Sequence, residues 1–258
     1  MKILEGVKKD GANYVFDYTS DNFSDVVHLT GPYLYKSSFG GNDYYFGYEF
    51  NPEISSKDRS DFIKFLKGTS DNNISDKDFQ QFVDRPLADL DKYVGLANVE
   101  TVIYPVSNIN NVVRKIVRAV LNFMQHSTDY ITYELVKNIP KDVTFDYKSF
   151  ATDRGGVNSQ SYKDSIPVIN KLLDNIHKSE YFSIARDVKT KYRPFIMNYL
   201  KLSDEYSSES LSSLINANSI LVIDDINTSG STLREILRIV RSLNNTANVY
   251  IYTLIGKA

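Results

Sequence analysis

The chain has 258 residues, of which 42% are hydrophobic and 24% are charged, and its formal net charge is −2. This length suffices for one large hydrophobic core, and the charge balance argues against a broadly basic surface for nucleic acid. Cysteine is absent, which excludes disulfides and thiolate chemistry, and the three histidines, His28, His126 and His177, lack metal-ligand spacing. With no apolar signal core and no segment of membrane-spanning length, we expect a cytoplasmic protein without membrane contact.

The first part of the chain alternates aromatic and polar residues, a pattern typical of strands. Strands are predicted at residues 14–18, 33–35 and 44–48, with a hairpin turn at 39–43. Residues 55–95 are predicted to be helical with a break at 68–73, and Ser75 followed by Asp78 is typical of a helix N-cap. We therefore expect an N-terminal α+β lobe at residues 1–97.

The remainder of the chain, residues 98–258, alternates strands with helices, which predicts a mainly parallel sheet with crossover helices. The predicted strands are 101–106, 130–136, 220–223 and 249–255, and the predicted helices are 109–124, 164–178, 188–202 and one that starts at 233. The polar segments 138–162 and 203–213 are predicted to be a mobile loop and a connector. We expect an α/β core over this whole part.

The most informative segment is a predicted strand, turn and helix at residues 220–236. Four apolar residues, Ile220 to Ile223, are typical of a parallel strand buried on both faces, and Asp224 and Asp225 follow directly. The helix after the turn would offer free backbone N–H groups and a positive dipole end to an anion. Because ligands of open α/β sheets bind at the carboxyl ends of the strands, we expect a ligand site here.

The side chains of the turn suit a sugar phosphate. Thr228, Ser229, Ser231 and Thr232 each add a hydroxyl donor, and Gly230 can take a positive φ that brings backbone N–H groups close to a phosphate. The two aspartates would repel a phosphate, but they can accept hydrogen bonds from sugar hydroxyls or hold Mg²⁺ through water. Receiver domains and nucleoside-triphosphate enzymes also carry acids at strand ends. The hydroxyl-rich turn argues against both. The chain also lacks the Gly-x-x-x-x-Gly-Lys-Ser/Thr and Gly-x-Gly-x-x-Gly motifs of nucleotide-binding proteins.

Residues 220–232 resemble the phosphoribosyl pyrophosphate (PRPP) motif of the type I phosphoribosyltransferases. The resemblance implies a doubly wound, mainly parallel α/β sheet of the phosphoribosyltransferase type, with the N-terminal α+β lobe as the hood that selects the acceptor. It also implies that Asp224 and Asp225 bind the ribose hydroxyls and, through water, Mg²⁺. The residues that it assigns to the 5′-phosphate are Asn227, Thr228, Ser229, Gly230, Ser231 and Thr232.

Two further segments match the family's site by position. Ser107 and Asn108 follow the first core strand, where the family binds pyrophosphate, although they lack the usual glycine or basic neighbour and are equally typical of a helix N-cap. Lys137 ends the second core strand and Arg154 lies on the loop after it, where the family places a basic residue and a flexible catalytic loop. These two cations and the aspartate pair are the predicted catalytic residues, because cations stabilise charge on a leaving pyrophosphate.

The resemblance implies an Mg²⁺–PRPP-dependent transferase that moves ribose 5-phosphate to a nitrogenous base or related acceptor and releases pyrophosphate. Two alternatives stay open. One is a non-catalytic regulatory or defence protein that senses PRPP or a nucleotide through the same loop and binds a protein or nucleic acid. The other is a hydrolase or lyase acting on a nucleoside 5′-phosphate. The sequence does not identify the acceptor or the oligomeric state, for which a homodimer is one option. Two roles are open for the aromatic residues of the third predicted strand, Tyr44, Tyr45, Phe46 and Tyr48. They either stack on a base or pack in the core, and core packing is the more common role of such residues.

Overall fold

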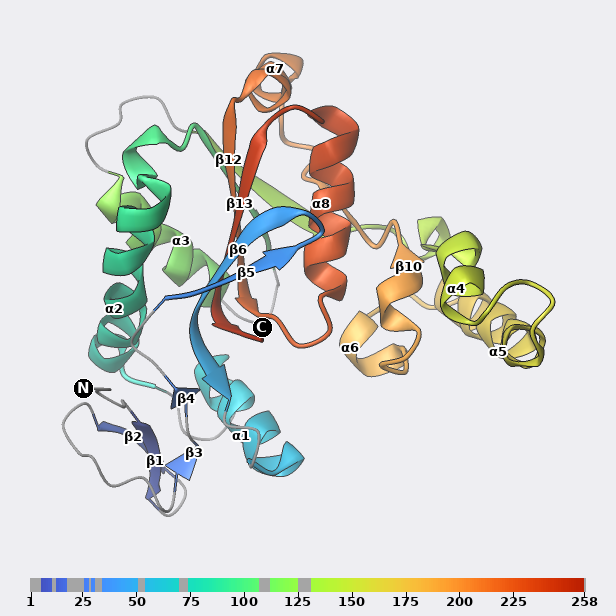
Figure 1. Cartoon of the computed structure of the whole chain (residues 1–258), viewed down its shortest axis with the longest axis horizontal. Coiled ribbons are helices and arrows are strands. Elements are labelled where there is room, and N and C mark those ends of the chain that lie inside the picture. The colour runs from blue at the N-terminus through green and yellow to red at the C-terminus, as the bar shows by residue number, and fades with distance from the viewer. Residues whose placement is uncertain are drawn as a thin grey trace.

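The protein is described by a computed structural model that covers residues 6–10, 13–17, 26–27, 29–30, 34–50, 54–69, 74–106, 112–124 and 131–257. The main sheet contains β4 (Leu29–Thr30), β5 (Tyr35–Phe39), β6 (Asn42–Phe50), β7 (Thr101–Pro105), β8 (Ile131–Lys137), β11 (Leu200–Leu202), β12 (Ser219–Ile226) and β13 (Asn248–Gly256). The strand order is β11-β8-β7-β12-β13-β6-β4, and β5 also pairs with β6. The described residues thus form a mixed α/β fold with a mostly parallel central sheet (Figure 1).

Parallel pairs make up the centre of this sheet. β12 pairs with β7 on one side, where Val222 lies opposite Ile103, and with β13 on the other, where Val222 lies opposite Ile251. β8 is parallel to β7 and β6 is parallel to β13, whereas β11, β4 and β5 pair in the antiparallel sense. From β7 the chain continues to β8, which pairs with one edge of β7, whereas β12 pairs with the other edge of β7. The carboxyl ends of β7 and β12 therefore meet at a topological switch point, the usual ligand position in such sheets.

Helices cover both faces of the sheet. The helices are α1 (Ser56–Leu66), α2 (Asp76–Val94), α3 (Val112–Phe123), α4 (Tyr147–Asp153), α5 (Gln160–His177), α6 (Ile184–Asp187), α7 (Ser208–Asn216) and α8 (Ser231–Leu243). Leu221 and Ile223 of β12 belong to the core shared with α2 and α3, whereas Ile220 and Val222 belong to the core shared with α8. Figure 1 shows α2 and α3 on one side of the strands and α8 on the other. This double burial explains why the strand is apolar on both faces.

Smaller elements complete the description. β1 (Gly6–Asp10), β2 (Asn13–Asp17) and β3 (Val26–Val27) form an antiparallel sheet of their own, and β9 (Thr144–Phe145) pairs with β10 (Ile196–Met197). The described ranges also contain the 3₁₀ turns η1 (Leu96–Asn98), η2 (Pro140–Asp142) and η3 (Arg193–Phe195). None of the helices in the described ranges is both long and apolar enough to cross a membrane.

Most of the predicted elements around the motif are confirmed. The hairpin turn joins β5 to β6, and the helical region is split into α1 and α2 as predicted. The Ser75 hydroxyl accepts a hydrogen bond from the Asp78 N–H at 3.1 Å, so the predicted N-cap is present. The predicted strands at 101–106, 220–223 and 249–255 correspond to β7, β12 and β13.

Three predictions between residues 138 and 213 are wrong. The predicted mobile loop contains β9, α4 and the start of α5. Phe145 and Phe150 in this segment are buried in an aromatic cluster, which its mostly polar composition does not indicate. The predicted helix at 188–202 is instead η3, β10 and β11, and it is interrupted where Asn198 takes a positive φ of 59°. The predicted connector contains α7, whose N-cap is Ser207.

The predicted N-terminal lobe contributes directly to the main sheet. β6, which belongs to that lobe, pairs with β13 of the predicted core, so the sheet is continuous across the boundary at residue 97. Tyr44, Tyr45, Phe46 and Tyr48 on β6 are each at most 1% exposed, so they pack in the core and offer no free face to a base. The division of the chain into two domains stays a prediction.

Candidate functional site

The acid pair lies at the carboxyl end of β12, between β7 and β13. Asp224 and Asp225 are only 5% and 6% exposed, although both are charged residue types. One oxygen of Asp224 accepts the Asp225 N–H at 2.9 Å, and one oxygen of Asp225 accepts the Ile226 N–H at 2.7 Å. The second oxygen of Asp225 lies 2.6 Å from Nζ of Lys67, the residue directly after α1. A lysine far away in the sequence therefore forms an ion pair with the motif.

Burial and neighbouring charges both shift the pKa of Asp224 and of Lys67. Burial raises the pKa of Asp224 well above its ordinary value, repulsion from Asp225 raises it further, and the Lys67 charge offsets only part of this. Burial lowers the pKa of Lys67, but the charge and hydrogen bond of Asp225 outweigh it, so the pKa is raised overall. Lys67 therefore stays an ammonium ion, and Asp224 holds its proton to a higher pH than an exposed aspartate.

The turn after β12 has the backbone geometry expected of an anion site. Gly230 takes φ +69° and precedes the first residue of α8, so the predicted positive φ is confirmed. No side chain caps α8, whereas serines at 55, 75, 159 and 207 accept a backbone N–H at the starts of α1, α2, α5 and α7. The first-turn N–H groups of α8 are thus left without a side-chain acceptor, at the positive end of the helix dipole.

The side chains of the turn divide into anchoring and exposed groups. Asn227 donates from its side chain to the Tyr44 hydroxyl at 3.1 Å and from its backbone to Ile255 O at 2.9 Å, so it fixes the turn to β6 and β13. Ser229 and Ser231 share a hydrogen bond at 2.8 Å, and Thr228 is exposed. Arg234 donates to Ser229 O at 3.1 Å and so holds the turn from the helix side.

A cavity of about 230 Å³ opens beside the acid pair. Its wall brings together the ends of three parallel strands: Pro105 at the end of β7, Lys137 at the end of β8, and Asp224 and Asp225 on β12. Thr232 and Lys67 also line it. The structure therefore places the predicted Lys137 in one cavity with the predicted acids, as expected from the alignment of parallel strand ends.

Tyr199 also lines this cavity, and its hydroxyl is buried. Within the described part of the chain this hydroxyl meets no hydrogen-bond partner at normal geometry, although it lies near Thr232. Burial raises the pKa of the phenol, so it remains a neutral donor. A buried hydroxyl without a protein partner is costly unless water or a ligand satisfies it.

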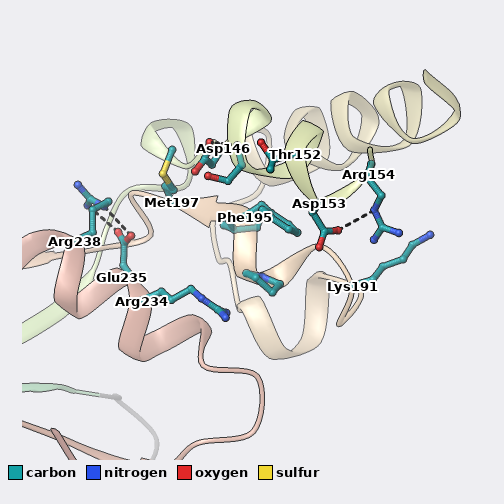
Figure 2. Close-up of a pocket in the computed structure, with 13 residues that line it drawn as sticks. Asp146, Thr152, Asp153, Arg154, Lys191, Phe195, Met197, Arg234, Glu235 and Arg238 are labelled. Carbon is teal, nitrogen blue, oxygen red and sulfur yellow. Dashed lines mark hydrogen bonds and ion pairs between the residues drawn. The ribbon is translucent and has the colours of Figure 1, made fainter. Parts of the chain in front are cut away.

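Arg154 lies elsewhere, in a second cavity of about 800 Å³ between α8 and the segment from α4 to β10. Its Nε lies 3.2 Å from an Asp153 oxygen, and its guanidinium lies over the Phe150 ring at 5.2 Å. Figure 2 shows Arg154 and Lys191 at one end of this cavity, Arg238 paired with Glu235 at the other, and Arg234 between them. Arg154 thus does not line the cavity of the acid pair.

The other candidates from the sequence do not join this site. Ser107 and Asn108 lie outside the described residues. His177 contacts Val143 O through Nε2 at 2.8 Å, which is a packing role, and His28 and His126 also lie outside the described residues. The structure describes no group of three or more histidine, aspartate or glutamate side chains that could hold a metal ion.

Three residues of the site were not found from the sequence: Lys67, Tyr199 and Arg234. Lys67 follows a helix in the predicted N-terminal lobe, and Tyr199 lies in a segment predicted to be helical, so neither had a local signal. Arg234 stands on the polar side of a helix, where a solvated side chain is the ordinary expectation.

Comparison with known proteins gives a weak structural likeness. No family model matches the chain, and no curated protein matches its sequence. Among solved structures, a hypoxanthine phosphoribosyltransferase from Staphylococcus aureus is similar at a TM-score of 0.35 and 13% sequence identity. The match covers 71% of this chain and 65% of that protein. A likeness at this level does not identify an activity, so the functional assignment rests on the geometry of the site.

The raised pKa of Asp224 predicts a pH-dependent effect of Asp224→Asn on stability. Asparagine keeps the oxygen that accepts the Asp225 N–H and does not ionise. A carboxyl group whose pKa is higher in the folded than in the unfolded protein stabilises the fold while it is protonated. This stabilisation is complete below the ordinary pKa of 3.8 and is lost as the pH rises through the folded-state pKa. Near the ordinary pKa of 3.8 the variant and the wild type should have the same free energy of unfolding. Toward neutral pH the variant should become the more stable of the two, by about 1.4 kcal/mol per unit of pKa shift.

Urea unfolding between pH 4 and pH 8 measures this difference. Asp204→Asn, at a side chain that is 83% exposed, is the matched control and should show no comparable trend. A stability difference for Asp224→Asn that does not grow with pH would contradict the assignment of a buried, proton-retaining Asp224.

Proposed function

We propose that the chain is a type I phosphoribosyltransferase with a doubly wound core and a cytoplasmic location. It would bind PRPP and transfer ribose 5-phosphate to a nitrogen atom of a base or related acceptor. The observation that carries this proposal is the pairing of an uncapped helix start, with Gly230 at φ +69°, and a buried acid pair at the switch point of the sheet. A ligand with a phosphate at one end and a sugar diol beside it matches both features.

The binding mode is set by the two halves of the site. The 5′-phosphate would accept hydrogen bonds from the first N–H groups of α8 and from the hydroxyls of Thr228 and Thr232. The ribose hydroxyls would donate to the carboxyl oxygens of Asp224 and Asp225. Lys137, in the same cavity, would face the pyrophosphate, and Tyr199, which also lines the cavity, would donate its hydroxyl to a ligand oxygen. Asn227, assigned to the phosphate by resemblance, would act by holding the turn.

The reaction would be a displacement at the ribose C1′ atom. The lone pair of the acceptor nitrogen forms the C1′–N bond as the C1′–O bond breaks, and the bonding electrons leave with pyrophosphate. The proton of the acceptor nitrogen is released to water. Lys137 would stabilise the negative charge that gathers on the leaving group, and the buried site would strengthen this interaction because the local dielectric is low. The chemistry thus depends on positioning and charge, which is in keeping with the few histidines of the chain.

A divalent cation held by the acid pair through water belongs to the family resemblance, and the described residues do not favour it. One oxygen of Asp225 is bound to Lys67 at 2.6 Å, and Asp224 tends to keep its proton. No third carboxylate joins them within the described ranges. Mg²⁺ as the cofactor of the reaction stays a proposal, and no step above is assigned to a protein-bound metal.

The acceptor would enter through the larger cavity. Arg234 links the larger cavity to the phosphate turn, because its side chain lines that cavity and donates to Ser229 O in the turn. The aromatic ring of Phe195 also lines the larger cavity, and Lys191 stands at its edge (Figure 2). An aromatic wall with cations beside it suits a planar acceptor that carries negative charge. This placement gives Arg154 a role on the acceptor side.

A PRPP-sensing protein without transferase activity is the second candidate. The ion pair between Lys67 and Asp225 favours it, because the acid pair is already neutralised by a protein group. PRPP binding without turnover on any acceptor would support this alternative over the enzyme.

Gly230→Ala should weaken PRPP binding about tenfold or more. A left-handed conformation costs a residue with a β-carbon about 1–2 kcal/mol. The added atom would also lie 2.6 Å from the Phe39 ring, which must then move together with the turn. Gly41→Ala is the matched control, since Gly41 takes φ +78° but has no atom within 4 Å of the added carbon. Isothermal titration with PRPP, after thermal unfolding has shown that both variants fold, measures the effect. Equal affinities in the two variants would contradict the anion site.

Lys191→Ala should raise the KM for the acceptor and leave the Kd for PRPP unchanged. Lys191 lines the larger cavity, whereas Lys189 is exposed and does not line it, so Lys189→Ala is the control. Pyrophosphate release from PRPP, followed with a panel of purine bases, pyrimidine bases and aromatic carboxylates, first identifies an acceptor and then gives its KM, and isothermal titration gives the Kd for PRPP. A weaker PRPP affinity with an unchanged acceptor KM would place the acceptor elsewhere.

A further inference from the structure

The ion pair between Lys67 and Asp225 is an unusual feature of the site. Lys67 follows the last residue of α1, and its Nζ approaches an Asp225 oxygen to 2.6 Å. The two side chains are 29% and 9% exposed, so this is a largely buried pair. Such a pair is strongly destabilised when one partner is removed, because the other is left as an uncompensated buried charge.

The Lys67 side chain also lies in the wall of the cavity that a ligand would enter. It lines the same cavity as Asp224, Asp225, Lys137 and Thr232. The cavity of about 230 Å³ is below the range of about 300–1,000 Å³ that is usual for small-molecule sites. The ammonium group therefore stands beside the acid pair on the side where a ligand or a cation would approach it.

A divalent cation and the Lys67 ammonium would compete for the same Asp225 oxygen. Hard cations such as Mg²⁺ need several oxygen ligands and usually bind through one or two carboxylates together with water. Here Asp225 already bonds to Lys67 through one oxygen and to the Ile226 N–H through the other. One oxygen of Asp224 accepts the Asp225 N–H. Three of the four carboxylate oxygens thus already have a protein partner.

We propose that Lys67 takes the place of a protein-bound divalent cation at the acid pair. Its ammonium group neutralises Asp225, holds that carboxylate toward the cavity for a sugar diol, and prevents the pair from binding Mg²⁺ by itself. The part of this proposal that concerns the sugar rests on the proposed function, whereas the part that concerns the metal does not. Lys67 is thus a positioning residue that sets which ligands the acid pair accepts.

The metal part is tested without any sugar phosphate. Mn²⁺, which can be followed by electron paramagnetic resonance, is titrated at pH 8 into the wild type and into Lys67→Met, with Mg²⁺ as competitor. The wild type should show no saturable site at millimolar Mn²⁺. Lys67→Met should gain one that binds at least tenfold more tightly, and Lys67→Met with Asp225→Asn should lose it again. Lys64→Met, at an exposed lysine one turn earlier on α1, should behave as the wild type.

Two outcomes would overturn the proposal. One is saturable Mn²⁺ binding by the wild type that Asp225→Asn abolishes, a measurement that does not require Lys67→Met to fold. The other is a folded Lys67→Met that gains no Mn²⁺ site. Lys67→Arg keeps the positive charge and should exclude Mn²⁺ as the wild type does, which separates the charge from the packing of the side chain.

The sugar part is tested with ribose 5-phosphate as the probe. Lys67→Met should weaken its binding, while inorganic phosphate should bind to both proteins equally, because phosphate alone does not reach the acid pair. An equal loss for the two probes would refute a role toward the sugar. If the wild type binds no ribose 5-phosphate, the proposed function fails, and the Mn²⁺ result still decides whether Lys67 excludes the metal.

Discussion

The parallel pairing of β12 with both β7 and β13 is the constraint on which the site depends. Because both neighbours are in place and helices cover both faces, the strand can expose polar side chains only where it ends. Asp224 and Asp225 stand at that end, and the turn after them must reach the start of α8 within a few residues. A buried acid pair and an uncapped helix start are therefore held close together by the sheet itself. This arrangement underlies both the proposed sugar site and the proposed phosphate site.

The motif was predictable because its signals are local. An apolar run, two acids, a glycine with positive φ and an amphipathic helix can each be inferred from neighbouring residues, and the structure places them as predicted. Between β8 and β12, the helix predicted at 164–178 is confirmed as α5, but the rest of the segment was predicted poorly. Its aromatic residues, such as Phe145 and Phe150, form a core through contacts with residues far along the chain, and polar neighbours hide that core in the sequence. Lys67 was missed for a similar reason, since only the fold brings α1 to the end of β12.

The segment from β9 to β10 changes where an acceptor is expected. The sequence suggested that the aromatic residues on β6 could form a hood, but these are buried in the core. The larger cavity lies instead between α8 and the segment from α4 to β10, and Figure 1 shows that segment beside α8. Arg234 contacts the phosphate turn from this side. Under the proposed function, PRPP would bind at the switch point of the sheet, and the acceptor would bind beside the segment from α4 to β10.

The most direct measurement is a crystal structure of the protein with ribose 5-phosphate, which carries both the phosphate and the diol. We expect the phosphate at the first N–H groups of α8, beside Thr228 and Thr232, and the sugar hydroxyls within hydrogen-bond distance of Asp224 and Asp225. A phosphate bound in the larger cavity among Arg154, Lys191 and Arg234, with the acid pair still closed by Lys67, would contradict the proposed site.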